Sequence, residues 1–271
     1  SIIWMGPQPK MTELAERVGV KNVKPFSDFE RDIQEALLAT RKVHYLPPYR
    51  HDNMIMLNKI LKIPFEELKA KASVEAIKAV VALREIKEEI EIKEMILAAE
   101  IGNEMHLTAL GLIQPGLYER EVSGMVEGVA LSGGGGVSFP VICSIRGETL
   151  HNHYHGNIMN HGDLLLLDCG AETEMRYCSD YTRVYPVSGK FTEQQKSIYQ
   201  IVVDANQKAF ELVKPGIINR DIHLETCKVI ATGLKELGLM KGNVDEAVAN
   251  GAHALFFPHG LGHMIGLDVH D

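Results

Sequence analysis

Cysteine is scarce in this sequence. The chain of 271 residues has four cysteines, at these positions: Cys143, Cys169, Cys178 and Cys227. No two of them form a C-x-x-C pair, which excludes a zinc ribbon and a thioredoxin-like redox motif. Scattered cysteines are typical of thiols that stay reduced in the cytoplasm, where disulfides are rare. We therefore expect free thiols and a cytoplasmic location.

Long apolar runs and a surplus of positive charge are also missing. No apolar run approaches the roughly 18 residues that would cross a membrane. The first residues have no basic segment followed by an apolar one, as a signal peptide would. The formal net charge is −8 and no basic stripe is present, which argues against binding to a phosphate backbone. We expect neither a membrane nor a nucleic acid as a partner.

The first part of the chain alternates short apolar segments with helical patterns. Residues 2–4 and 42–46 are predicted to be strands, and residues 12–18 and 28–38 are predicted to be helices. Together they predict a small α/β unit at residues 1–75. Because this unit does not begin with a complete strand of its own, we interpret it as part of a domain.

Two helical patterns farther along the chain share one design. The first covers residues 80–113, and the second begins at Thr192, which forms a predicted capping box with Gln195. Each ends at a Pro-Gly corner, because proline cannot continue a helix. At an offset of 100 residues the patterns match in these pairs: Pro115 and Pro215, Ile101 and Ile201, Ala109 and Ala209, Leu112 and Leu212, Val122 and Ile222, Val129 and Val229. We predict an internal duplication that gives two helix-pair halves. Strand-like sequence lies at residues 137–145, 163–169 and 177–187, and residues 252–269 are extended in character.

Two aspartates flank the turn between two of these strands. Residues 164–167 are all leucine, as expected of a strand buried on both faces, and Asp168 follows them. A hairpin centred on Glu174 would place Asp168 opposite Asp180, with Cβ atoms about 4.5–5.5 Å apart on one face. Buried carboxylates at that distance repel, and a divalent cation would relieve the repulsion. The alternative is one turn residue and one surface residue without a shared role.

Histidines gather near the end of the sequence, where His259, His263 and His270 lie among several glycines. The spacing of His259 and His263 matches H-E-x-x-H, but no glutamate lies between them and the glycines oppose a helix, which excludes that zinc-peptidase motif. Three histidines among small residues favour a polar site that a substrate approaches closely. The alternative is a purely structural role for each.

The chain contains four ordered motifs: DCGAE at 168–172, SDYTR at 179–183, HGLGH at 259–263 and LDVHD at 267–271. Together they resemble the Xaa-Pro aminopeptidase (aminopeptidase P) and prolidase family of pita-bread metallopeptidases. The resemblance covers residues 76–271 as the catalytic domain, and residues 1–75 resemble the later part of the family's amino-terminal domain. It implies an α+β pita-bread fold with pseudo-twofold helix-pair halves, preceded by part of a smaller α/β domain.

The resemblance also implies a metal centre. Asp168, Asp180 and His263 match the family's metal ligands, and Asp180 would bridge the two ions of a dinuclear divalent centre. Manganese is the expected metal, with cobalt, iron or zinc as alternatives.

Three further histidines match family residues that bind substrate and stabilise the intermediate: His151, His259 and His270. The implied reaction is hydrolysis of the Xaa-Pro bond at the amino terminus of a peptide by a metal-bridging hydroxide. Proline-containing peptides are therefore the expected partners, together with further copies of the chain, since the family implies a homodimer or a larger homo-oligomer.

One departure from the family pattern concerns two glutamates that complete its site beyond the last histidine motif. The sequence stops at Asp271, so we expect it to be a fragment that lacks the carboxyl-terminal end of the catalytic domain. A chain that truly ended there would be expected to be inactive.

Three alternatives share the fold. Prolidase cleaves only Xaa-Pro dipeptides. Creatinase works without a metal, and the presence of Asp168, Asp180 and His263 argues against it. A non-catalytic pita-bread module would bind peptides, but such domains usually lose the ligand residues that are present in this chain.

Overall fold

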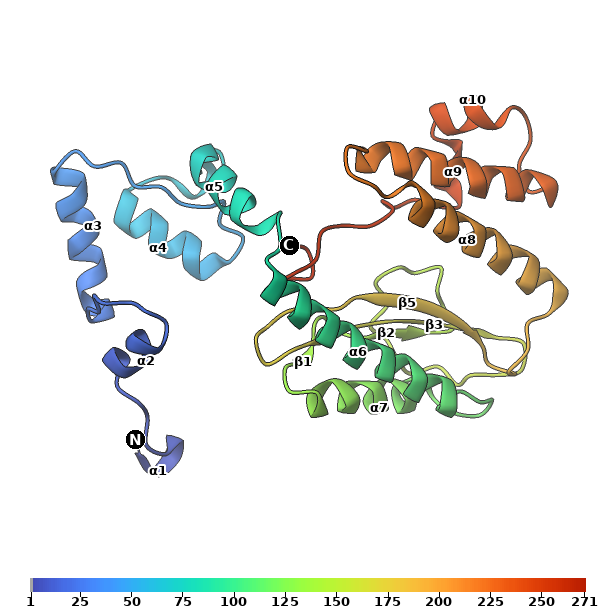
Figure 1. The fold of residues 1–271 in the computed structure, drawn as a ribbon, viewed down its shortest axis with the longest axis horizontal. Helices are drawn as coiled ribbons and strands as arrows, with labels where there is room; N and C mark the ends of the chain where they lie inside the picture. The colour runs from blue at the N-terminus through green and yellow to red at the C-terminus, as the bar shows by residue number, and fades with distance from the viewer. Residues whose placement is uncertain (1) are drawn as a thin grey trace. The chain divides into compact units, whose positions relative to one another are not determined.

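The computed structural model describes residues 2–271, and the chain divides into two compact units, Ser1–Leu83 and Arg84–Asp271. Figure 1 shows the helices and strands of both, coloured along the chain. No helix within residues 2–271 combines the length and the apolar character that crossing a membrane requires. The four cysteines are buried and free, which confirms the expectation from their spacing.

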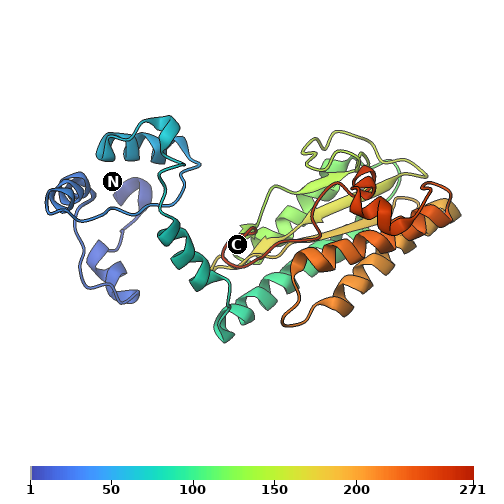
Figure 2. The same cartoon turned by 90° about the horizontal axis from the view of Figure 1, so that it is seen from above.

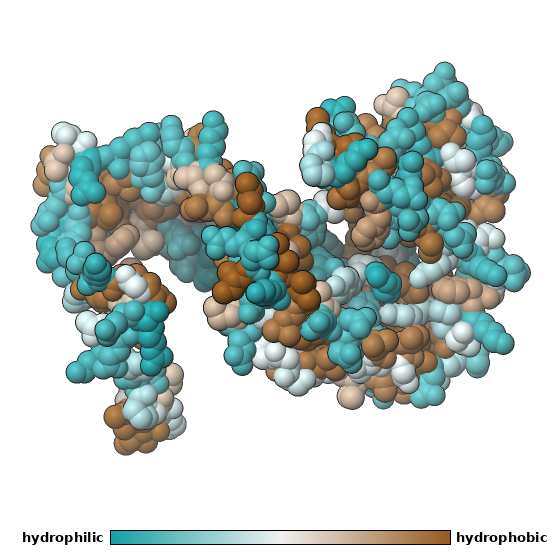
Figure 3. All heavy atoms as spheres, in the orientation of Figure 1, coloured by the Kyte–Doolittle hydropathy of each residue, from teal (hydrophilic) through white to brown (hydrophobic). Residues whose placement is uncertain are grey.

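The first unit is built from short helices. They are α1 (Ile2–Met5), α2 (Met11–Arg17), α3 (Phe29–Leu38), α4 (His51–Leu61) and α5 (Val74–Arg84), with 3-10 turns η1 (Phe26–Asp28) and η2 (Phe65–Glu67). The helices expected at residues 12–18 and 28–38 are confirmed as α2 and α3. The core of this unit is small, with Pro48, Ile60 and Leu68 buried, and Trp4 of α1 is 86% exposed. Figure 3 shows hydrophobic side chains at the end of this unit where Figure 1 labels α1.

The strands expected at residues 2–4 and 42–46 are wrong. Residues 2–4 form most of α1, and residues 42–46 have no neighbouring strand among residues 2–83. The backbone of Tyr45 instead accepts one bond from the Ser73 amide at 3.0 Å, and its hydroxyl donates to the Leu68 carbonyl at 3.0 Å. A lone extended segment cannot form a ladder, so strand-forming residue types do not produce a strand here.

The second unit contains two small antiparallel sheets. Their strands are β1 (Gly136–Val137), β2 (Ile142–Ser144), β3 (Leu164–Cys169), β4 (Ala171–Glu172) and β5 (Tyr181–Pro186). The order is β2-β3-β5 in one sheet, and β1 pairs with β4 in another. Helices α6 (Glu89–Leu112) and α7 (Glu119–Ser132) run side by side along the strands in Figures 1 and 2.

Strand β3 is fully buried on one face only. Leu165, Leu167 and Cys169 are inaccessible and pack with apolar residues of α6 and α7, such as Met105 and Val126. Each buried leucine stabilises the fold by about 2 kcal/mol. The expectation of a strand buried on both faces is corrected, because the alternate residues of β3 are only partly covered. Asp168 therefore lies on the face of the sheet that points away from this core.

The second helix pair repeats the first. Helices α8 (Glu193–Leu212) and α9 (Asn219–Glu236) end and begin 100 residues after α6 and α7 do. Where the helices cross, a Cβ added at Gly133 would lie 2.8 Å from Ile101, and one added at Gly233 would lie 2.5 Å from Ile201. The two crossings thus use matched residues, which supports the duplication. The capping box predicted at Thr192 is confirmed, with the Gln195 amide 3.2 Å from the Thr192 hydroxyl.

The predicted helix over residues 80–113 is interrupted. The chain leaves the helical path between α5 and α6, and α6 begins anew at its own capping box, in which the Glu91 carboxylate accepts from the Glu88 amide at 2.7 Å. After α9 come α10 (Val244–Ala249) and the 3-10 turn η3 (Ala252–Leu255), so the segment expected to be extended from residue 252 begins with a helical turn. Residues 256–271 are irregular.

Candidate metal centre

Asp168 is held by its neighbour across the sheet. Its register partner on β5 is Thr182, whose hydroxyl donates to Asp168 Oδ1 at 2.8 Å. Burial is the main cause that raises the pKa of Asp168 above its ordinary value, the Thr182 bond opposes it, and the nearby charge of Asp180 raises it further. Asp168 is therefore a partly desolvated carboxylate with a second carboxylate close by.

Asp180 does not lie directly opposite Asp168, so the predicted register is wrong by two residues. The turn is centred on Met175 rather than Glu174, because Arg176 adopts a left-handed conformation with φ 72° and the Thr173 amide donates to the Tyr177 carbonyl at 2.9 Å. A shift of the partner by two residues leaves its side chain on the same face. Asp180 thus becomes the diagonal neighbour of Asp168, still within reach of it.

Gly170 allows the two aspartate segments to touch. A Cβ at this position would lie 1.8 Å from the Ser179 carbonyl oxygen, so no other residue fits without moving the backbone. Ser138 joins the same contact, with its hydroxyl donating to that oxygen at 2.7 Å and its amide donating to the Gly170 carbonyl at 3.0 Å. Backbone contact, rather than side-chain packing, thereby fixes the spacing between Asp168 and Asp180.

His263 reaches the aspartates from the irregular segment after η3. Its Nε2 lies 3.2 Å from Asp180 Oδ2, and its Nδ1 lies 2.8 Å from the Met264 carbonyl oxygen. Because a carbonyl can only accept, Nδ1 bears the proton and the Nε2 lone pair points toward the carboxylate in the neutral ring. Metal-binding histidines typically have this arrangement, in which one nitrogen donates to a carbonyl and the other coordinates.

The segment containing His263 is fastened at two points. The Cys178 amide donates to the Gly266 carbonyl at 2.8 Å, and the Asp271 carboxylate is bound by Arg84 and by Lys87 at 2.5 Å. Burial acts to raise the pKa of Asp271, but the two cationic partners together hold this pKa below its ordinary value. Asp271 therefore stays ionised and anchors this segment beside the hairpin.

The structure brings two of the three predicted catalytic histidines to the centre. The His270 ring lies 4.2 Å from the His263 ring between centroids, and His151 is close enough to Asp168 to contribute to its electrostatic environment. His259 instead packs edge-on against Phe257, with ring centroids 4.6 Å apart. Within residues 2–271, no hydrogen bond or ring contact joins His259 to the two aspartates or to His263.

Glu119 is a buried residue that the sequence did not single out. It is the first residue of α7 and is fully inaccessible. Its carboxylate accepts from the Ser144 hydroxyl at 3.0 Å, the Ile145 amide at 2.7 Å, and the side chain of Asn157 at 3.0 Å. These donors stand at both ends of the loop that contains His151, so Glu119 closes this loop. In the sequence it resembles any acidic residue at a helix start.

His106 is a second buried polar residue that was missed. It lies on the face of α6 that packs on the sheet, where it bonds to the Tyr185 hydroxyl at 3.0 Å and donates from Nε2 to the Tyr181 carbonyl at 3.1 Å. Burial lowers the pKa of His106, which favours the neutral ring. It thereby positions the start of β5, directly after Asp180. Its place within an apolar stripe gave no sign of this role.

Asp168, Asp180 and His263 form a donor set that suits a divalent metal ion. Two carboxylates and a neutral imidazole match the preferences of manganese, cobalt, iron and zinc. The charge of Asp180 raises the pKa of Asp168, because each of two neighbouring carboxylates disfavours ionisation of the other. These residue types fit a divalent metal, and Asp180 is the member that lies beside both of the others. The ligand atoms of all three do not lie within 4.8 Å of one another in the described residues.

Comparison with known proteins gives concordant matches. Residues 93–271 match the family described as Metallopeptidase family M24. The Xaa-Pro aminopeptidase of Escherichia coli is 33% identical over 279 residues, covering 99% of this chain and 63% of that protein, and a probable Xaa-Pro aminopeptidase of Chaetomium globosum is 32% identical over 276 residues, covering 100% and 45%. The chain thus spans less than two thirds of the length of these relatives.

Solved structures agree with this result. The aminopeptidase PepP of Pseudomonas aeruginosa superimposes with a TM-score of 0.85 at 30% identity, covering 100% of this chain and 63% of that one. A substrate complex of E. coli aminopeptidase P gives a TM-score of 0.84 at 29% identity, with the same coverage. The α+β pita-bread fold expected from the sequence is confirmed.

Proposed function

Because the chain belongs to metallopeptidase family M24, we propose that it forms part of an Xaa-Pro aminopeptidase, which hydrolyses the bond between the first residue of a peptide and a following proline. The observation that supports this most directly is that Asp180 lies beside Asp168 in its own hairpin and beside His263, which follows the second helix pair. His263 Nε2 lies 3.2 Å from Asp180 Oδ2, so residues from both halves of the duplicated domain meet at this site.

Asp168, Asp180 and His263 would hold a divalent metal, which we propose to be manganese in a dinuclear centre, with cobalt, iron or zinc as alternatives. When bound, such a centre supplies Lewis acidity and an activated water for attack on the peptide carbonyl. Zinc supports a product complex of a related protein, since one structural neighbour is a zinc-substituted E. coli aminopeptidase P with product.

The histidines around the centre would act on the substrate. His270, which contacts the His263 ring, and His151, near Asp168, would donate hydrogen bonds to the carbonyl oxygen as negative charge develops there. His259 would meet the peptide farther from the aspartates. Glu119 would hold the loop of His151 in place, since its carboxylate bonds to both ends of that loop.

Metal binding is the most direct test of the proposed centre. We expect calorimetric titration with Mn²⁺ to show binding that Asp180→Asn weakens by more than about 100-fold, because even indirect partners of a metal ligand cost about 10–100-fold. Asp204→Asn, on the exposed surface of α8, is the matched control and should bind as the unaltered protein does. Equal binding by both variants would refute the site.

The preferred length of the substrate distinguishes an Xaa-Pro aminopeptidase from a prolidase. The metal-loaded enzyme is expected to cleave an Xaa-Pro-Yaa tripeptide faster than an Xaa-Pro dipeptide, as measured by release of the first amino acid. A preference for the dipeptide would make the protein a prolidase. Tight binding of both peptides with cleavage of neither would instead support a non-catalytic peptide-binding module.

We propose that residues 1–75 are part of an amino-terminal domain and that residues 76–271 belong to the catalytic domain, a division supported by the presence of two compact units. We also propose assembly as a homodimer or larger homo-oligomer. Light scattering during size-exclusion chromatography measures the mass directly, and a mass equal to that of one chain would exclude the oligomer.

A further inference from the structure

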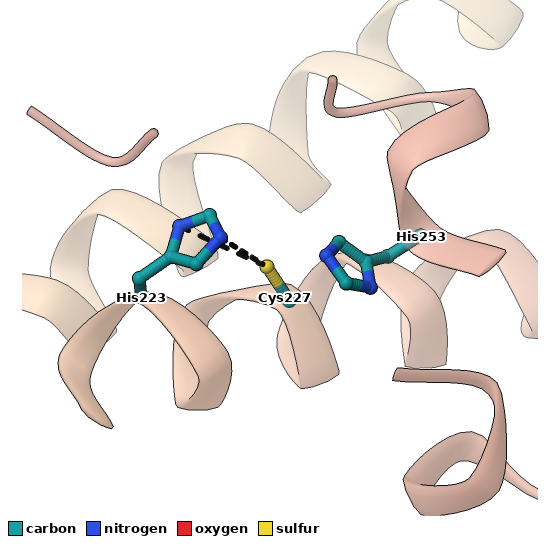
Figure 4. Close-up of side chains that lie close together, drawn as sticks. All are labelled: His223, Cys227 and His253. Atoms are coloured by element: carbon teal, nitrogen blue, oxygen red, sulfur yellow. Dashed lines mark hydrogen bonds between the residues drawn. The ribbon is translucent and has the colours of Figure 1, made fainter. Parts of the chain in front are cut away.

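A second group of metal-binding residue types lies away from the aspartates. His223 and Cys227 stand one turn apart on α9, and His253 approaches them from η3, as Figure 4 shows. One ligand atom from each of the three side chains lies within 4.8 Å of the other two. None of these residues belongs to the four motifs that resemble the peptidase family.

The distances suit a tetrahedral ion. Cys227 Sγ lies 3.5 Å from His223 Nε2. Bond lengths of about 2.3 Å to sulfur and about 2.0 Å to nitrogen, at a tetrahedral angle, place the two ligand atoms about 3.5 Å apart. The helix therefore already holds this pair at the separation that a bound ion would require, and the loop brings the third ligand alongside.

His253 gives an independent indication of a ligand. It is 8% exposed, and its Nδ1 is buried without a hydrogen-bond partner among the described residues. Buried polar atoms without a partner are rare in folded proteins, and each calls for an explanation such as an ion. Figure 4 shows the ring directed toward Cys227. A thiol-to-imidazole bond between Cys227 and His223 would leave this atom unsatisfied, whereas a shared ion satisfies all three side chains.

The surroundings suit a permanently held ion. Cys227 is completely buried in a small apolar cluster with Ala231 and Val248, against which Met240 and Phe257 pack. Burial is the main cause that lowers the pKa of His223, which favours the neutral ring that coordinates metals. An apolar shell around a ligand group restricts solvent access.

The matching helix of the first pair, α7, has different residues at these two positions. In the first helix pair the positions that match His223 and Cys227 are Ser123 and Glu127, which do not form such a set. Helix α7 thus has neither an imidazole nor a thiol at these positions, so this set of residue types occurs in only one of the two copies.

We propose that His223, Cys227 and His253 bind a transition-metal ion of the zinc class, separate from the centre at Asp168 and Asp180. Binding replaces the thiol proton of Cys227, which leaves to solvent, and water fills the remaining tetrahedral position. The ion ties α9 to the segment that leads from His253 to His263. Its role is therefore structural, and it does not depend on the proposed peptidase activity.

Cobalt provides a test that separates the two sites. Cobalt bound to a thiolate gives a charge-transfer absorption in the near ultraviolet, which the aspartate centre cannot produce because it contains no sulfur. We expect Co²⁺ titration of the purified protein to develop this absorption, zinc to abolish it, and Cys227→Ser to eliminate it. Cys178→Ser, which alters another buried free thiol, should leave it unchanged.

Two further measurements guard against misfolded variants. His223→Ser gives α9 the residue that the first helix pair has, and it should fold with an unchanged circular dichroism spectrum but lose the cobalt absorption. X-ray absorption of the zinc-loaded, unaltered protein should show one sulfur neighbour at about 2.3 Å. A zinc environment of nitrogen and oxygen alone, or a cobalt absorption that persists in Cys227→Ser, would overturn the proposal.

Discussion

The two helix pairs share a backbone plan and differ in what they bury. Helix α6 has five buried residues and α7 has another five, and most of them face the sheet. Helix α8 has one, Ala205, and the buried residues of α9 face α8, α10 and η3. A duplicated helix-corner-helix thus fixes the crossing through Gly133 and Gly233, while the partner of each pair decides which side chains become core.

The two helix pairs also differ in the polar side chains that they contribute. The first pair contributes buried polar residues, Glu119 and His106, which position the strands and the loop of His151. The second pair leads to the segment that contains His259, His263 and His270, and itself contains His223 and Cys227. One copy therefore holds the aspartate strands and the His151 loop in place, and the other leads to the segment that contains His263.

Replacement of Glu119 should have the largest effect on stability. Glu119→Ala leaves buried donors from Ser144, Ile145 and Asn157 without an acceptor, and we expect the free energy of unfolding to fall by about 3 kcal/mol. Asn219 begins α9 at the matching position but is exposed, so Asn219→Ala should change it by less than about 0.5 kcal/mol. Urea denaturation measures both. Equal costs would remove the contrast between the two copies.

Adding a methyl group at either helix crossing should lower stability by a similar amount if the two copies share their geometry. Gly133→Ala and Gly233→Ala each place a Cβ against an isoleucine, and each should cost about 1–3 kcal/mol of stability through overpacking. Gly128 on α7 has open space around it, so Gly128→Ala should stabilise by about 0.5–1 kcal/mol. Thermal denaturation would reveal a failure of the symmetry as a large cost in one copy alone.

Removal of the Thr182 hydroxyl should act on the metal rather than on the fold. Thr182→Val deletes the bond to Asp168 Oδ1 and frees this carboxylate to rotate, so Mn²⁺ affinity should fall about tenfold. Thr149→Val, in an exposed loop, is the control. Calorimetry gives both affinities. Unchanged binding in Thr182→Val would mean that the sheet does not orient the ligand.

The smallest expected effect is on the pH dependence of stability, through His106. The folded-state pKa of His106 lies below its ordinary value of 6.5, so the stability contributed by the neutral ring is present above pH 6.5 and is lost as the pH falls through the lowered pKa. His106→Asn, which gives α6 the residue that α8 has as Asn206, should flatten this acid-side slope in urea midpoints measured across pH. A slope that stays the same would assign it to other groups.

Local sequence patterns were sufficient to predict features that depend on residues close together in the chain. Thr192 and Gln195 lie within one turn, so their capping box could be predicted, and the alternation along β3 places Asp168 on one face whichever residue it faces. The register failed because it depends on Arg176 adopting a left-handed conformation, which this residue type seldom does.

Features that depend on distant segments were out of reach. Residues 42–46 have strand-forming side chains but no partner strand, and a strand exists only as a pair. Glu119 and His106 acquire their roles from donors and acceptors that lie 25 to 79 residues away. The sequence shows that such a side chain can bond, but not that a buried partner will face it.

The fastening of the His263 segment has a kinetic consequence. Its carboxyl-terminal side is held by the Gly266 carbonyl and by Asp271 between Arg84 and Lys87, so lifting residues 264–271 away from the hairpin breaks these contacts. An ion held there would leave only as fast as the segment opens. We therefore expect the lifetime of a bound metal to be set by the opening of residues 264–271, and to depend little on salt because the Asp271 side chain is 3% exposed.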